Sequence, residues 1–177
     1  MSPISLKLPV VIGALIAIIL QIVVAPNVNV LSAAPNFILC YVVAIAVGNA
    51  RNVGYVLPFV CGLVYDIAGS GPVGAMAFVC VAVTFAASLA FQAFDNETLF
   101  IPVAIIIASC FLANIAYGIL MIACGVDVGL LDALRCVCLP CGLYDTVLSL
   151  IAYPLVLRFA LKGKTQNEMT IIDTGIN

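Results

Sequence analysis

The amino-acid sequence predicts an all-α membrane protein, a bundle of six transmembrane helices. Of the 177 residues, 66% are hydrophobic and 8% are charged, whereas a soluble domain is about half apolar and about a quarter charged. The mean hydropathy is +1.32, and the few charged residues lie between long apolar segments. Polar groups cannot cover such a surface, so we expect its solvent to be the lipid bilayer.

Charged residues and prolines set the boundaries of the predicted helices, because a spanning helix needs about 20 mostly apolar residues. We predict one transmembrane domain over residues 1–162, with helices near 8–25, 31–48, 52–66, 72–94, 99–124 and 133–158. Pro26 interrupts the uncharged stretch between Lys7 and Arg51, and Pro35 is expected in the first turn of the second helix. Residues 163–177 are predicted to form a polar cytoplasmic tail.

The third predicted helix is short enough to be a re-entrant segment instead of a span. The distribution of basic residues favours a span, because cytoplasmic loops and tails are enriched in Lys and Arg. With six crossings, one side receives all the basic residues except Arg135, namely Lys7, Arg51, Arg158, Lys162 and Lys164. We therefore expect six spans with both termini cytoplasmic.

The composition argues against several classes of function. The chain has no histidine, which removes the commonest general base and the commonest transition-metal ligand. It has no phosphate-binding glycine loop, no nucleophile paired with a base, no cluster of metal ligands and no basic stretch suited to nucleic acid. We expect a protein that is not an enzyme and that uses no cofactor or metal.

Cysteines are numerous but carry little functional signal. Five of the eight lie in apolar runs, where a free cysteine behaves as a small hydrophobe, namely Cys40, Cys61, Cys80, Cys110 and Cys124. Cys138 and Cys141 form a Cys-x-x-Cys step, the spacing of redox and metal sites. Because no histidine or second such step accompanies them, packing is the favoured interpretation and redox activity the alternative.

Asp66 precedes a segment rich in glycine and proline that predicts a tight hairpin between the third and fourth helices. Gly69 and Gly74 permit positive φ and close backbone approach, and Pro72 is expected to open the fourth helix. The favoured interpretation is that Asp66 caps or orders this turn. The alternative is that it lines a surface for a partner or ligand, with Arg135 as its counter-ion, because ionisable residues in membranes are often functional.

Asp145 lies near the middle of the sixth predicted helix, where an isolated carboxylate costs about 2.5–3.5 kcal/mol. Asn114 lies near the middle of the fifth helix, which runs antiparallel to the sixth, so the two side chains are expected at similar depth. We predict a hydrogen bond between them, since polar residues hold membrane helices together. A proton relay would need further titratable groups at that depth, and the sequence offers none.

The order of these motifs resembles the MreD family of rod shape-determining proteins. The resemblance covers residues 33–162 and lies on Pro35-Asn36, on the segment from Asp66 through Gly69, Pro72 and Gly74, and on Tyr144-Asp145 with Tyr153-Pro154. Asn36 and Asp145 depart from the family pattern, which has an acid at the first position and an amide at the second.

The resemblance implies a multi-pass protein of the bacterial plasma membrane with a fold similar to the substrate-binding components of energy-coupling-factor transporters. It implies a scaffold for cell elongation that binds an MreC-like protein and, through it, couples MreB filaments to the peptidoglycan synthase RodA and its transpeptidase; a homo-oligomer is a further option. The alternative is a substrate-binding component of a nutrient transporter, which needs several convergent polar groups. The few polar residues at mid-membrane depth favour the scaffold.

Overall fold

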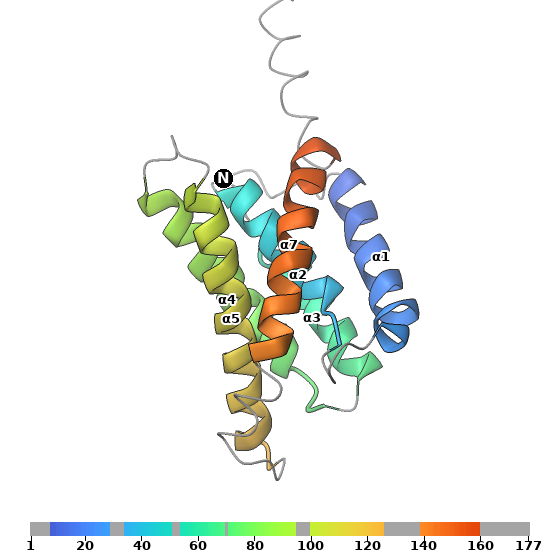
Figure 1. The fold of residues 1–177 in the computed structure, drawn as a ribbon. Helices are drawn as coiled ribbons and strands as arrows, with labels where there is room; N and C mark the ends of the chain where they lie inside the picture. Colours follow the sequence, from blue (N-terminus) through green and yellow to red (C-terminus); the bar gives the residue numbers. More distant parts are fainter. Residues whose placement is uncertain are drawn as a thin grey trace, which may run out of the picture.

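The computed structural model describes residues 8–28, 34–50, 54–69, 71–94, 100–125 and 139–159, and this part of the chain is helical without any strand (Figure 1). The elements are α1 (Leu8–Val23), the 3-10 turn η1 (Ala25–Asn27), α2 (Phe37–Gly48), α3 (Val56–Ala68), α4 (Ala75–Ala93), α5 (Phe100–Ala123) and α7 (Leu139–Phe159). The all-helical class predicted from the composition is therefore confirmed for the described residues.

Four helical segments are long and apolar enough to cross a membrane, namely Leu8–Asn27, Ala75–Ala93, Phe100–Ala123 and Leu139–Arg158. The other two helices, α2 and α3, contain 12 and 13 residues. At 1.5 Å per residue they are about 18 Å and about 20 Å long, which is less than the thickness of about 30 Å of a hydrocarbon core. If α2 and α3 cross a bilayer, the backbone N–H and C=O groups at their ends lie within the hydrocarbon and need hydrogen-bond partners from the protein.

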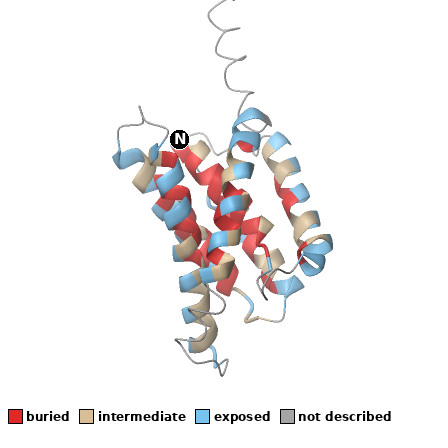
Figure 2. Cartoon of the chain, viewed as in Figure 1, coloured by how far each residue is buried: buried red, intermediate tan, exposed pale blue. Residues whose placement is uncertain are grey.

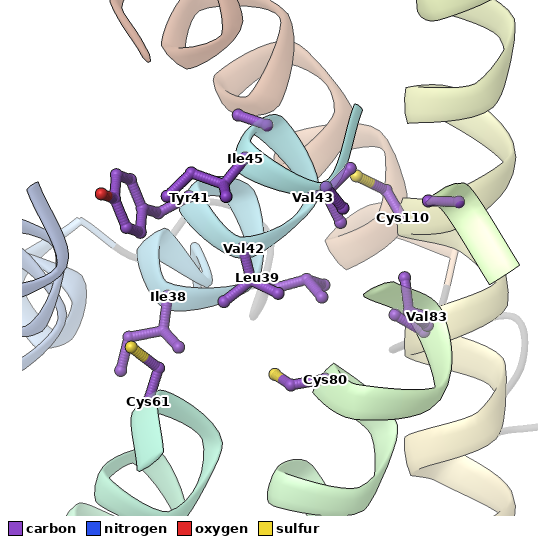
Figure 3. Close-up of a cluster of buried hydrophobic side chains, with 14 of the residues drawn as sticks. Ile38, Leu39, Tyr41, Val42, Val43, Ile45, Cys61, Cys80, Val83 and Cys110 are labelled. Carbon is purple, nitrogen blue, oxygen red and sulfur yellow. The ribbon is translucent and has the colours of Figure 1, made fainter. Parts of the chain in front are cut away.

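Helix α2 is the centre of the bundle. It contacts each of the other α-helices of the described chain, and ten of its 12 residues are buried, which gives the red central helix of Figure 2. In Figure 3, Ile38 points toward Cys61 of α3, Leu39 toward Cys80 and Val83 of α4, and Val43 toward Cys110 of α5. Tyr41 points the other way, toward α1. A helix that is apolar on all sides suits this position, because every face of it is covered by protein.

Helices that follow one another in the chain run in opposite directions. At one end of the bundle the Tyr41 hydroxyl donates to the carbonyl of Val10, and the Gln92 amide donates to the carbonyl of Ala50. The start of α1 and the end of α7 lie at this same end, at the top of Figure 1. The turns η1 and α3–α4 lie toward the opposite end, whereas α2 begins between the two ends.

The first turns of α2 and α4 differ from the sequence prediction. Helix α2 begins at Phe37, after the non-helical residues 34–36, so Pro35 does not lie in its first turn. Asn36 is the N-cap, a position that asparagine favours, and the residue before a proline is disfavoured in a helix. Pro72 does not open α4 either, because Gly74 at φ 99° stands between it and the first helical residue, Ala75.

The remaining boundaries agree with the prediction to within a few residues where they can be compared. Helix α3 extends to Ala68, so Asp66 lies inside its last turn. The predicted tail 163–177 and the first part of the last predicted helix, 133–138, lie outside the described residues.

Candidate functional site

The Asp66 carboxylate binds the N-terminus of α4. Its Oδ2 atom accepts hydrogen bonds from the backbone N–H groups of Gly74 at 2.9 Å, Met76 at 3.0 Å and Ala77 at 3.1 Å, and its Oδ1 atom lies 3.0 Å from the Met76 nitrogen. The first N–H groups of a helix have no partner within the helix, so Asp66 supplies one from the preceding helix. Gly74 adopts the left-handed conformation that turns the chain back toward the carboxylate.

This geometry confirms that Asp66 caps the turn between α3 and α4. Only 2% of the residue is exposed, and its oxygens are directed to the start of α4; a contact with a partner stays a prediction. The proposed counter-ion, Arg135, lies outside the described residues, and that pairing stays a prediction.

The Asp145 carboxylate performs the same task for α2. Its Oδ1 atom accepts the backbone N–H of Asn36 at 2.8 Å, and its Oδ2 atom accepts the Asn114 side-chain amide at 3.0 Å. The predicted hydrogen bond between Asn114 and Asp145 is thus confirmed. Asn36 and Asp145, the two positions that depart from the family pattern, are in direct contact.

Two further side chains complete the N-terminus of α2. The Gln21 side chain of α1 accepts the backbone N–H of Phe37 at 2.8 Å and donates to the carbonyl of Pro35 at 3.3 Å. The Asn36 side chain accepts the backbone N–H of Leu39 at 2.9 Å. We call Gln21, Asn36, Asn114 and Asp145 the capping cluster, since together they join α1, α5 and α7 to the start of α2.

The capping cluster explains how a short helix can begin inside the bundle. Asp145 is fully buried, and the non-helical residues 34–36 lie beside it inside the bundle, because Asn36 contacts Asp145. Irregular backbone is tolerated at membrane depth only where protein groups or a cavity satisfy it. Here three of the N–H groups at the start of α2 receive side-chain acceptors.

Both buried acids are neutralised by helix ends. A helix N-terminus carries about half of a positive elementary charge, and Asp66 and Asp145 each bind one. Arg158 is the one cation among the described residues, and it lies at the other end of α7 from Asp145. Within the described chain, backbone and amide donors therefore take the place of a salt bridge.

A small cavity and a larger groove adjoin the capping cluster. The cavity has a volume of about 90 Å³ and is lined by Asn36, Asn114, Asp145, Tyr65, Tyr117, Cys141 and four apolar residues. The groove, of about 300 Å³, lies between the ends of α1 and α3 and is lined by Gln21, Ile22, Ala25, Pro26, Ala34, Tyr65, Ala68 and Gly69. Ala34 and Tyr65 line both, so they form the boundary between them.

Cysteines lie mainly in packed positions. Cys40, Cys61, Cys80 and Cys110 are buried free thiols, as predicted for packing residues, whereas Cys124 is exposed. Cys141 lies in the cavity wall, and Cys138 lies outside the described residues, so a redox pair stays untested. No group of metal-binding side chains occurs among the residues that the structure describes.

Sequence reasoning missed Gln21 and Tyr65. Gln21 is the one polar side chain in the first predicted helix, 8–25, and an amide there is costly unless it finds a partner; that signal could have identified it. Tyr65 forms an edge-to-face pair with Tyr117 of α5, with ring centroids 6.1 Å apart, and only this contact between distant residues reveals its place at the cavity.

Comparison with known proteins identifies the family. The model of the rod shape-determining protein MreD family matches residues 5–162. No curated protein and no solved structure matches the chain. The matched region includes both capped helix ends and every described helix. The chain therefore belongs to the MreD family of rod shape-determining proteins.

Proposed function

We propose that this protein is a non-catalytic membrane scaffold of the bacterial cell-elongation machinery. In this role it binds an MreC-like membrane protein and couples MreB filaments to peptidoglycan synthesis by RodA and its transpeptidase. The family membership supplies the rod shape-determining role. The MreC-like protein and the wall-synthesis proteins are partners that we propose.

The observation that carries the scaffold proposal is the use made of the buried polar groups. Among the described residues, no buried side-chain nitrogen or oxygen lacks a hydrogen-bond partner. The two buried acids and their amide neighbours serve the ends of α2 and α4. The cavity of about 90 Å³ beside Asn36 is smaller than the usual ligand site of about 300–1,000 Å³.

We further propose six crossings of the plasma membrane with both termini in the cytoplasm. Support comes from the start of α1 and the end of α7, which lie at one end of the bundle, and from the basic residues expected on that side. The capped N-terminus of α2 supports a crossing by a helix shorter than the hydrocarbon core. The similarity to energy-coupling-factor components stays a prediction of the family resemblance.

The second candidate is a substrate-binding component of a nutrient transporter. The groove of about 300 Å³ favours it, because this volume reaches the lower limit for a small-molecule site. Against it, most of the groove lining is apolar, and Gln21, its amide residue, already bonds to the start of α2.

Affinity purification from the native membrane separates the two candidates. The scaffold predicts recovery of an MreC-like protein together with wall-synthesis proteins. Recovery of an ATPase module with a bound small molecule would support the transporter component instead.

A further inference from the structure

Helix α3 is shorter than the helix beside it. It runs antiparallel to α4, and the two helices share one end, where Asp66 accepts the backbone N–H groups of Gly74 and Ala77. From this shared end α3 extends about 20 Å and α4 about 29 Å. Helix α4 therefore continues beyond the start of α3 by about 9 Å.

The ring contact between Tyr55 and Phe85 indicates a similar offset. Tyr55 is the N-cap of α3, and its ring centroid lies 6.2 Å from that of Phe85 in α4. Phe94, the C-cap of α4, lies nine residues beyond Phe85, about 13 Å along the axis. Leu89, one turn after Phe85 on the same face of α4, is 50% exposed, so the bundle leaves this part of α4 open.

The outward surface of α3 is apolar along its length. Every exposed residue of the helix is apolar, namely Val56, Phe59, Val60, Ile67 and Ala68. Hydrocarbon is the solvent that suits such a surface. The apolar height that α3 offers is about 20 Å, which is less than the thickness of about 30 Å of an ordinary hydrocarbon core.

The start of α3 sets the limit of the hydrocarbon on this side of the bundle. Gly54 is non-helical and half-buried, and Tyr55 is 43% exposed. Irregular backbone does not face lipid within the hydrocarbon, because its polar groups need partners there. A tyrosine ring, moreover, favours the boundary between the hydrocarbon and the headgroups. Both properties locate this boundary at Tyr55 and not at the level of Phe94.

We propose that the bilayer is locally thinner beside α3, by about 10 Å, because the headgroups of one leaflet descend to Tyr55. The ligand of this surface is phospholipid, with acyl chains against Val56, Phe59 and Val60 and headgroups at the start of the helix. The inference rests on the proposed crossing of the membrane by α3, and the scaffold function does not depend on it. Thinning costs free energy, and a neighbouring membrane protein with an equally short span would reduce that cost.

Tryptophan fluorescence can measure the depth of Tyr55, because the chain contains no tryptophan. The full chain carrying Tyr55→Trp, Phe94→Trp or Leu112→Trp is reconstituted into phosphatidylcholine vesicles brominated either near the headgroup or near the end of the acyl chain. Leu112, a 52% exposed residue in the middle of α5, provides the deep reference. In a bilayer of uniform thickness Tyr55→Trp lies about 13 Å deeper than Phe94→Trp. We expect equal depths instead, with the strongest quenching of both by bromine near the headgroup.

Ile67→Trp, near the other end of α3, tests the crossing itself and should also be quenched near the headgroup. Deep quenching of Tyr55→Trp with shallow quenching of Ile67→Trp would overturn the thin bilayer and leave the crossing standing. Shallow quenching at position 55 with deep quenching at position 67 would refute the crossing by α3, and the thin bilayer with it. Absence of quenching by either lipid at position 55 would show that protein covers this surface, which also overturns the proposal. Val56→Trp, at a 68% exposed neighbour, repeats the measurement without removing the ring contact of Tyr55 with Phe85.

Discussion

Replacing Asp66 by alanine should lower the free energy of unfolding of the protein, because it disrupts the hairpin formed by α3 and α4. The substitution removes the acceptor of three backbone N–H groups at the start of α4, those of Gly74, Met76 and Ala77. Two of these bonds are fully buried, and an unsatisfied buried donor costs about 1–3 kcal/mol. The expected loss is therefore about 2–6 kcal/mol, a large part of the roughly 5–15 kcal/mol that stabilise a folded protein.

Buried thiols provide the assay for this loss. Cys61 and Cys80 are 2% and 0% exposed, so a thiol-reactive fluorophore reports unfolding in detergent as they become accessible. Ile67→Ala is the matched control, because Ile67 is the adjacent residue of α3 and is 68% exposed. We expect a lower melting temperature and less protein in the membrane for Asp66→Ala, and a smaller decrease for Asp66→Asn, which keeps one oxygen acceptor.

One result would refute the capping role of Asp66. If Asp66→Ala melts at the same temperature as Ile67→Ala and loses only partner binding, the carboxylate acts at a surface and does not stabilise the start of α4. A melting temperature of Asp66→Asn equal to that of Asp66→Ala would instead show that the charge, and not the acceptor geometry, stabilises α4.

Three further sets of substitutions test the packing around α2 and α4. Asp145→Asn should reduce the stability by about 1–3 kcal/mol, because it removes the carboxylate that binds the start of α2. Adding Asn36→Asp should recover at least half of this loss, because it restores a carboxylate at the same helix end; no recovery would argue against the need for an acid there. Gly62→Ala should cost about 1–3 kcal/mol, because its Cβ would lie 2.5 Å from a backbone atom of α4. Gly69→Ala should lower the melting temperature less, because its Cβ would lie 3.3 Å from the nearest backbone atom; an equal or larger decrease for Gly69→Ala would contradict the close approach at Gly62. Gln21→Leu removes a side-chain acceptor from the start of α2 and should lower the melting temperature in the same thiol assay; an unchanged value would mean that another group replaces it.

Much of the fold could be predicted because the bilayer leaves few choices. Charged residues end apolar helices, and antiparallel neighbours place mid-helix residues at equal depth, which is why the bond between Asn114 and Asp145 was accessible to sequence reasoning. The role of Asp66 was also within reach, since glycines after an acid at a helix end indicate a turn.

The side chains that cap the start of α2 could not be predicted, because they depend on which helix lies at the centre of the bundle. Because α2 is surrounded by the other helices, its start must be satisfied by side chains from α1 and α7, and no local pattern near residue 36 specifies these partners. The two departures from the family pattern, Asn36 and Asp145, lie far apart in the sequence. In the structure they share one hydrogen bond, so that one acid still serves the start of α2.

Depletion of the protein in a rod-shaped bacterial host, followed by measurement of cell width and length, tests the central claim most directly. If the chain is a scaffold of the elongation machinery, depletion turns rods into round cells, and a plasmid copy of the wild-type chain restores them. Cells that remain rod-shaped with normal dimensions after the protein has disappeared would contradict the account.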